Sequence, residues 1–229
     1  MRNCFFNKLG KGTKMMRMFL IFSFSQCLIS LTSCSEEDDT VQEYDNWQAK
    51  NEAYFEEQYQ QHLAASNATC FVLKSYTKGD TVKVSNLPHT QCILVDVLPS
   101  DFIAKGDKTT MPLFTDDVSI HYSGNLLPSP TYPSGYPFDS SYYGSFQLDV
   151  AEPDVMSVYG VIVGFSTALQ HMHRGDHWRV TIPYQLGYGV SDYNSIPGYS
   201  TLIFDIRLVD FEKGSGNDQV NSVSLVKDY

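Results

Sequence analysis

The residues that could do chemistry in this chain are concentrated between positions 117 and 211, and most of them are apolar. Aromatic and branched side chains recur there at the ends of short strand-like runs, and one acid, Asp139, directly follows Phe138. Such a pattern predicts an apolar pocket with very few polar groups. The chemistry open to such a pocket is to bind an apolar group and exclude water. The segment offers no convincing nucleophile, general base or cofactor motif.

Short strands and one helix are expected to position this pocket. Alternation of apolar and polar residues predicts strands at 118–122, 146–150, 178–182 and 202–208. Residues 164–173 predict a short helix, which Gly175 is suited to end in a left-handed conformation. Two further strand candidates lie between residues 67 and 101, and residues 124–137 form a proline-containing loop. Together these elements predict an α+β domain, an antiparallel sheet wrapped on one helix.

A helix is expected before this domain, over residues 44–65, because that stretch lacks Gly and Pro and is rich in Glu, Gln and Ala. The face expected to be buried is formed by Trp47, Asn51, Tyr54, Gln58 and Leu63, with Phe55 and Tyr59 widening it. The favoured interpretation is a helix packed on the following domain. The alternative is an arm for dimerisation or for contact with other proteins.

The first 33 residues are typical of a secretory leader, in which basic residues precede an apolar run. That run, residues 18–31, is too short to span a bilayer comfortably. Residues 31–34, Leu-Thr-Ser-Cys, resemble a bacterial lipobox. The resemblance implies cleavage before Cys34 and acylation of its thiol, which would hold the chain on a membrane. The alternative is an ordinary leader with an incidental cysteine. Translation starts at Met1, Met15 or Met16, and the sequence leaves these three open.

Acidic residues follow Cys34 directly, in a tether predicted over residues 34–43. The run at 35–39 resembles the acidic sorting tag of surface lipoproteins of Bacteroidetes, although an acidic run is also typical of a solvated tether. We therefore expect the protein to be located in the cell envelope, anchored to the outer membrane at either its periplasmic face or the cell surface. Beyond the leader the formal charge is −15, because all 26 acidic but only 11 of the 16 basic residues remain. That balance disfavours nucleic acid as a partner.

Two cysteines, Cys70 and Cys92, lie in strand-like runs beyond the leader. In an oxidising compartment they form either one disulfide or two buried thiols, because pairing cannot be read from spacing. Four histidines, His121, His171, His173 and His177, invite a metal interpretation. Their spacing gives no strong ligand pattern, so we expect solvated histidines and no metal.

Six motifs in order carry a resemblance to a known family. They are VSIHYSG, FDSS, VIVGF, MHRGDHWRVTIP, GYG and IPGYSTLIFDIRLVDF. Over residues 112–212 they resemble an FKBP-type peptidyl-prolyl isomerase domain. The resemblance implies a bent antiparallel sheet around one short helix, with the site between them. The implied domain covers residues 67–212, after a helical segment at 44–66 and before a polar tail at 213–229.

The resemblance also implies the residues of the site. Catalytic roles fall on Tyr122, Phe138, Asp139 and Tyr188. The residues expected to line the substrate pocket are Phe146, Val161, Ile162, Phe165, Ile196 and Phe204. The backbone N–H of Ile162 and the hydroxyl of Tyr188 are expected to bind substrate carbonyls, and Asp139 to order the pocket through Tyr122. For the pocket residues, plain core packing is the alternative. Phe165 stands where the family most often has Trp, and the loops at 123–137 and 149–160 are long.

The function implied is peptidyl-prolyl cis-trans isomerisation, without a cofactor, on proline-containing exported proteins. A macrolide of the FK506 or rapamycin type is the implied small ligand. The first alternative is an FKBP-like module that binds proline-containing or unfolded segments without useful turnover. The second is a structural or glycan-binding surface lipoprotein, which Trp47 and Trp178 are too isolated to favour.

Overall fold

The computed structural model describes residues 42–100, 102 and 107–214. The predicted leader, the lipidation site Cys34 and almost all of the acidic tether lie outside the described residues. So does most of the predicted C-terminal tail, from residue 215 onward. Within the described ranges, no helix combines the length and the apolar character needed to cross a bilayer.

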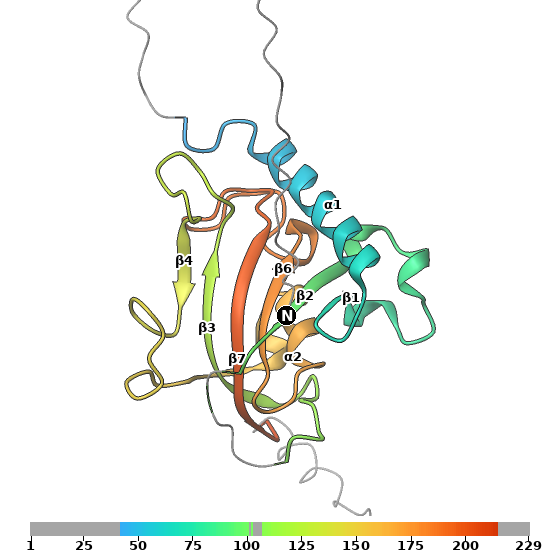
Figure 1. Ribbon diagram of the computed structural model, residues 1–229, viewed down its shortest axis with the longest axis vertical. Coiled ribbons are helices and arrows are strands. Elements are labelled where there is room, and N and C mark those ends of the chain that lie inside the picture. The colour runs from blue at the N-terminus through green and yellow to red at the C-terminus, as the bar shows by residue number, and fades with distance from the viewer. Residues whose placement is uncertain (1–41, 101, 103–106, 215–229) are drawn as a thin grey trace, which may run out of the picture. The chain divides into compact units, whose positions relative to one another are not determined.

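The described residues form one antiparallel sheet, with strand order β1-β2-β6-β7-β3-β4, and with β5 paired to β3 (Figure 1). The strands are β1 (Cys70–Lys74), β2 (Cys92–Leu98), β3 (Asp117–Asn125), β4 (Pro137–Ser140), β5 (Asp154–Ser157), β6 (His177–Ile182) and β7 (Leu202–Glu212). With a short helix against it, this sheet confirms the predicted α+β class.

β3 and β7 are paired along the full length of β3. Val118, Ile120 and Tyr122 are buried at alternate positions of β3, as their alternation predicts. The β3–β7 register shifts between Ser119 and Ile120, an irregularity of the kind that bends and twists a strand. The alternation brings Tyr122 to the same face as the helix α2.

The core helix α2 spans Val163–Leu169 and packs on β2 and β6. Phe165, Ala168 and Leu169 are buried against the sheet. The helix is shorter than the predicted 164–173, because the chain leaves the helical path at Gln170 and continues in turns. Gly175 has φ +90°, the left-handed backbone expected for it.

The N-terminal helix α1 spans Trp47–Ala65 and packs on β1 and β2, in agreement with the favoured interpretation (Figure 1). Its buried residues are Trp47, Asn51, Phe55, Tyr59 and His62. The predicted face was therefore wrong at its C-terminal end, where Leu63 is 42% exposed and His62 takes the inward position. Two polar side chains join α1 to the segment before β7. The Trp47 indole N–H donates to Ser200 Oγ at 2.8 Å, and Asn51 Oδ1 accepts from the Thr201 N–H at 2.7 Å.

The strand predicted at residues 146–150 is wrong. The structure has a loop and a turn there, with Leu148 and Val150 exposed. β5, at Asp154–Ser157, instead pairs with the first half of β3. The alternation at 146–150 finds no neighbouring strand to pair with, because this edge of β3 is taken by β4 and β5.

The disulfide alternative for Cys70 and Cys92 is not supported, and both side chains are buried. Cys70 lies opposite Asp96 and Cys92 opposite Lys74, so the two cysteines occupy opposite ends of the β1–β2 pair. A disulfide requires Cα atoms within about 7 Å, which this register does not provide.

Candidate active site

Four aromatic residues, one from α2 and three from separate strands, pack together as one wall. Phe165 of α2 packs edge-on against Phe204 of β7, with ring centroids 4.9 Å apart, and against Tyr122 of β3 at 5.9 Å. Phe138 of β4 meets Phe204 edge-on at 5.3 Å. Edge-to-face contacts at these distances are favoured by the charge distribution of aromatic rings. The structure therefore brings together four of the predicted site residues.

Gly124 of β3 makes this close packing possible. A Cβ atom at this position would lie 2.6 Å from Phe138 Cζ and 2.7 Å from Phe204 Cε1. Real Cβ atoms do not approach ring carbons so closely, so both rings would have to move. The glycine of the HYSG motif is thus required by the contact between Phe138 and Phe204.

The main polar feature beside these rings is a hydrogen bond between Tyr122 and Asp139. The Tyr122 hydroxyl donates to Asp139 Oδ2 at 2.9 Å, as the resemblance implies. Tyr122 is 8% exposed, whereas Asp139 is exposed. Burial raises the pKa of the Tyr122 hydroxyl strongly, and the hydrogen bond and charge of Asp139 raise it further. Tyr122 is therefore a fixed neutral donor that orients a carboxylate at the edge of the aromatic wall.

Ser141, which was not singled out in the sequence, fixes the position of Tyr122. Its hydroxyl accepts from the Tyr122 backbone N–H at 2.9 Å, and its own N–H donates to the Tyr122 carbonyl at 3.0 Å. The signal was the serine pair of the FDSS motif, which follows Asp139 directly. Asp154, at the start of β5, is a second acid that was missed, and its charge also raises the pKa of Tyr122.

Tyr188 and Ile196 lie in the segment between β6 and β7. The Tyr188 ring is half-buried and stacks on Tyr193 at a centroid distance of 4.4 Å and an interplanar angle of 9°. Burial raises the pKa of the Tyr188 hydroxyl, with contributions from Tyr193 and Asp139. Tyr193 pairs with Ile196 through two backbone hydrogen bonds of 2.9 Å, and Ile196 is buried.

Val161 and Ile162 precede α2 and are partly buried against the main core. Ile162 is the N-cap residue of α2, with φ −56° and ψ 150°. Its backbone N–H lies before the first helical turn and is not needed as a donor within the helix. That position is compatible with the expected role of this N–H as a donor to a substrate carbonyl.

Phe146 differs from the prediction. Its ring packs on His121 at 5.0 Å, and the Arg207 guanidinium carbon lies 4.0 Å from the ring centroid. His121 and Arg207 are paired across β3 and β7 and point away from the face that carries Tyr122 and Phe204. Phe146 therefore lies on the opposite face of the sheet, and we leave it out of the candidate pocket.

The remaining histidines considered for a metal have separate partners. His171 Nδ1 lies 2.8 Å from the Thr167 carbonyl, and His177 Nδ1 lies 3.1 Å from the Pro99 carbonyl. Among the residues that the structure describes, neither of them, nor His121 or His173, belongs to a group of three or more metal ligands.

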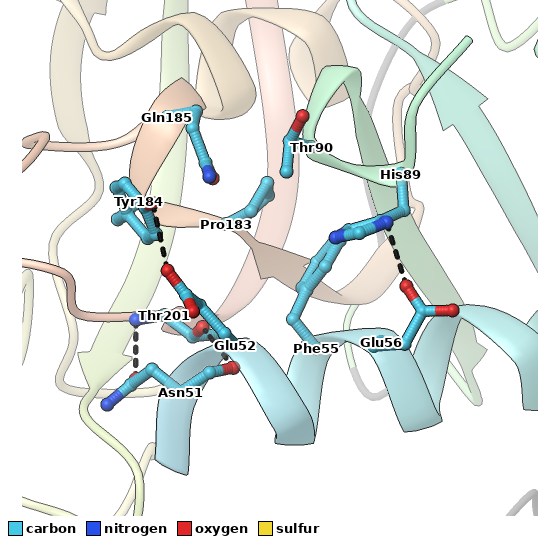
Figure 2. Close-up of a pocket in the computed structure, with 10 residues that line it drawn as sticks. All are labelled: Asn51, Glu52, Phe55, Glu56, His89, Thr90, Pro183, Tyr184, Gln185 and Thr201. Atoms are coloured by element: carbon cyan, nitrogen blue, oxygen red, sulfur yellow. Dashed lines mark hydrogen bonds and ion pairs between the residues drawn. The ribbon is translucent and has the colours of Figure 1, made fainter. Parts of the chain in front are cut away.

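A hollow of about 340 Å³ lies elsewhere, between α1 and the turn at Pro183 (Figure 2). Glu52 accepts from the Tyr184 hydroxyl at 3.1 Å, and Glu56 lies 2.7 Å from His89 Nδ1. Both carboxylates are thus engaged by side chains of the hollow itself. None of the residues predicted for the site lines it.

Comparisons with known proteins find similarity over the region that contains these residues. Residues 108–209 match the family model of the FKBP-type peptidyl-prolyl cis-trans isomerase. The chain is 37% identical over 113 residues to the "Macrophage infectivity potentiator" of Trypanosoma cruzi, covering 49% of this chain and 52% of that protein. It is 39% identical over 101 residues to an FKBP-type 22 kDa peptidyl-prolyl cis-trans isomerase of Escherichia coli, covering 44% and 43%.

The chain spans about half or less of the length of these curated relatives. A solved structure, FkpA from Escherichia coli, is similar with a TM-score of 0.49 and 26% identity, covering 74% of this chain and 63% of that one. The matched range contains Tyr122, Phe138, Asp139, Phe165, Tyr188 and Phe204. Residues 108–209 are therefore similar to an FKBP-type peptidyl-prolyl cis-trans isomerase domain.

Proposed function

We propose that this chain is a peptidyl-prolyl cis-trans isomerase that acts on Xaa-Pro bonds of exported proteins and assists their folding. The observation that supports this most is the Tyr122–Asp139 hydrogen bond beside the wall formed by Phe138, Phe165 and Phe204. The wall supplies an apolar surface for a proline ring, and the hydrogen bond fixes a carboxylate beside it.

The reaction explains why such a pocket suffices. Rotation about the Xaa-Pro bond faces a barrier of about 18–20 kcal/mol, because the amide loses its resonance in the twisted state. The twisted C–N unit is less polar than the planar amide. A dry apolar pocket therefore disfavours the planar ground state more than the twisted state, and only such a difference accelerates the step. No bond to a nucleophile is formed or broken.

The polar groups have complementary parts in this proposal. The Tyr188 hydroxyl, whose pKa is raised by burial, stays protonated at neutral pH and donates to a substrate carbonyl. The Ile162 N–H donates to a second carbonyl. Asp139, held by Tyr122, orders the pocket and faces the carbonyl that rotates. Val161 and Ile196 complete the apolar lining.

We further propose where this reaction takes place. Acylation of Cys34 tethers the domain to the outer membrane, at its periplasmic face or at the cell surface, through the acidic segment that follows. The lipobox-like Leu-Thr-Ser-Cys and the preceding leader support this part of the proposal. Clients are then proteins that fold after export.

The experiment is a peptide isomerisation assay with the chain that begins after Cys34. A short substrate with Leu or Phe before proline is followed for the parent chain and for Asp139→Ala and Tyr188→Phe. We expect turnover by the parent and lower kcat/KM in both variants, with unchanged circular dichroism. A folded parent that binds the peptide without turnover favours the alternative of a binding module.

A further inference from the structure

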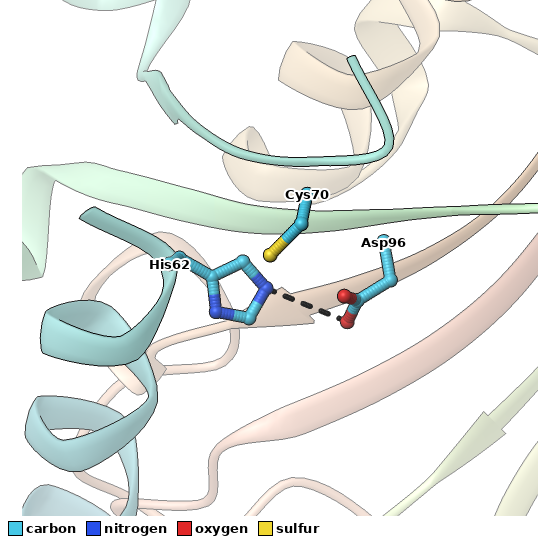
Figure 3. A group of neighbouring side chains, drawn as sticks. All are labelled: His62, Cys70 and Asp96. Carbon is cyan, nitrogen blue, oxygen red and sulfur yellow. Dashed lines mark ion pairs between the residues drawn. The ribbon is translucent and has the colours of Figure 1, made fainter. Parts of the chain in front are cut away.

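Three potential metal ligands meet outside the isomerase site: His62, Cys70 and Asp96 (Figure 3). They come from α1, β1 and β2, and their ligand atoms all lie within 4.8 Å of one another. This is the only such group of three or more in the described part of the chain. β1 and β2 lie at one end of the strand order, and β3 and β4, which carry Tyr122 and Asp139, lie toward the other.

Strand pairing and helix packing bring these side chains together. Cys70 and Asp96 are direct partners across β1 and β2, so their side chains leave the sheet side by side on one face. The buried face of α1 ends at His62 and covers that same face. His62 and Cys70 are each 2% exposed, so they meet in the interior.

The His62 ring is oriented as a ligand. Its Nδ1 lies 2.8 Å from the Gln58 carbonyl oxygen, which can only accept, so Nδ1 carries a hydrogen. In the neutral ring, Nε2 then holds a lone pair. Figure 3 shows this nitrogen on the side of the ring that faces Asp96, with a dashed line for the ion pair between them. Metal-binding histidines commonly have this second hydrogen bond to a carbonyl.

The surroundings of His62 Nε2 favour a positive charge close to this nitrogen. It is buried and lies 3.4 Å from Asp96 Oδ2, with which it forms an ion pair when the ring is protonated. A nitrogen lone pair facing a carboxylate is unfavourable unless a positive charge lies between them. Arg179, which is paired with Asp96 across the strands, binds Asp205 instead through two hydrogen bonds of 2.9 and 3.0 Å.

The donor set identifies the class of cation. One imidazole nitrogen, one thiolate and one carboxylate suit zinc, whereas calcium and magnesium prefer oxygen ligands. Tetrahedral bonds of about 2.0–2.3 Å separate ligand atoms by about 3.3–3.8 Å. The 3.4 Å between Nε2 and Oδ2 has this spacing, and the other pairs, within 4.8 Å, need shifts of about 1 Å at most.

We propose that His62, Cys70 and Asp96 bind one zinc(II) ion, which fastens α1 to the β1–β2 edge of the domain. Thiolate and carboxylate together neutralise the ion, and binding releases the thiol proton of Cys70. The Asp96 side chain is 20% exposed, which gives a route from solvent for the ion and for a water as the fourth ligand. This site differs from the histidines that the sequence drew attention to.

The test titrates cobalt(II), and then zinc(II), into the full chain after metal is removed with a chelator. We expect one cobalt per chain with a thiolate-to-cobalt absorption band, displacement of that band by zinc, and a higher melting temperature with zinc but not with calcium. A chain that gives neither the band nor the shift overturns the proposal, and leaves a proton as the cation on His62.

Two cysteine variants provide the matched comparison, because Cys92 is equally buried but lies at the other end of the β1–β2 pair. Cys70→Ser is expected to lose the band and about tenfold or more in zinc affinity. Cys92→Ser is expected to keep both. A band that survives in Cys70→Ser, or that disappears in Cys92→Ser, places the thiolate elsewhere and overturns the proposal. If circular dichroism shows that Cys70→Ser does not fold, His62→Gln replaces it. His62→Gln must also lose about tenfold in affinity, and unchanged affinity overturns the proposal.

Discussion

Removing one hydroxyl, in Tyr122→Phe, tests whether the Tyr122–Asp139 hydrogen bond organises the active site. The substitution keeps the ring and its contacts with Phe165 and Phe204, at centroid distances of 5.9 and 6.4 Å. It removes only the donor that lies 2.9 Å from Asp139 Oδ2. The change is therefore nearly isosteric, and its effect reports on the hydrogen bond.

The expected size follows from the surroundings of the two groups. A hydrogen bond to a charged group contributes about 1.5–3 kcal/mol. Asp139 is exposed, so water can replace the lost donor. The free energy lost with the hydrogen bond is therefore expected near the lower limit of this range. A loss of about 1.4 kcal/mol in transition-state stabilisation lowers kcat/KM about tenfold. Asp139→Ala should cost at least as much, because it also leaves the buried hydroxyl of Tyr122 without its acceptor.

The assay is a double-mutant cycle on kcat/KM, with urea unfolding measured in parallel. If the two groups act as a unit, Tyr122→Phe combined with Asp139→Ala should lose no more activity than Asp139→Ala alone. Tyr143→Phe is the control, because that ring is fully exposed and its hydroxyl loss should change nothing. Activity of Tyr122→Phe within about twofold of the parent, or losses that multiply in the double variant, would refute the reasoning.

Three further predictions concern the fold. Gly124→Ala should destabilise the domain by about 1–3 kcal/mol in urea unfolding, because its Cβ would lie 2.6 Å from Phe138; an unchanged midpoint would contradict the packing described. Asn51→Ala should lower the free energy of unfolding by about 1–3 kcal/mol, because the buried Thr201 N–H loses its acceptor. A negligible change in this free energy would mean that Asn51 does not hold α1 at this point. Burial raises the pKa of the Cys92 thiol from its ordinary value of 9.0 to about 11, so between these values the folded state retains a proton that the unfolded chain loses. Stability should therefore decline between about pH 9 and 11, and Cys92→Ala should flatten that part of the profile; equal slopes would contradict this assignment.

Much of the site could be predicted because its signals are local. Alternation along β3 places Tyr122 on the core face, and the motif that contains Phe138 and Asp139 fixes their order along β4. Phe165 and Phe204 follow from the helical stripe and the long last strand. Their places in the core depend on short-range periodicity, which is visible in one sequence. Their roles in a site were implied by the resemblance to the FKBP family.

The wrong predictions concern residues whose structure and burial depend on packing between distant parts of the chain. Phe146 begins an alternating run, but the edge of β3 is occupied by β4 and β5, so the run forms no strand and its aromatic ring covers the other face. On α1, the apolar Leu63 was expected to be buried, yet His62 takes that place because it faces Cys70 and Asp96. That cluster joins three elements, and no spacing along the chain predicts it.

The central claim is that the wall formed by Tyr122, Phe138, Phe165 and Phe204 binds the proline whose peptide bond rotates. The most direct measurement is isomerisation of a Leu-Pro peptide by the chain that begins after Cys34, with and without a macrolide of the FK506 or rapamycin type. The account predicts turnover that the macrolide blocks, and that Asp139→Ala lowers. Turnover that is absent from a folded sample, or that the macrolide leaves unchanged while it binds the chain, would contradict it.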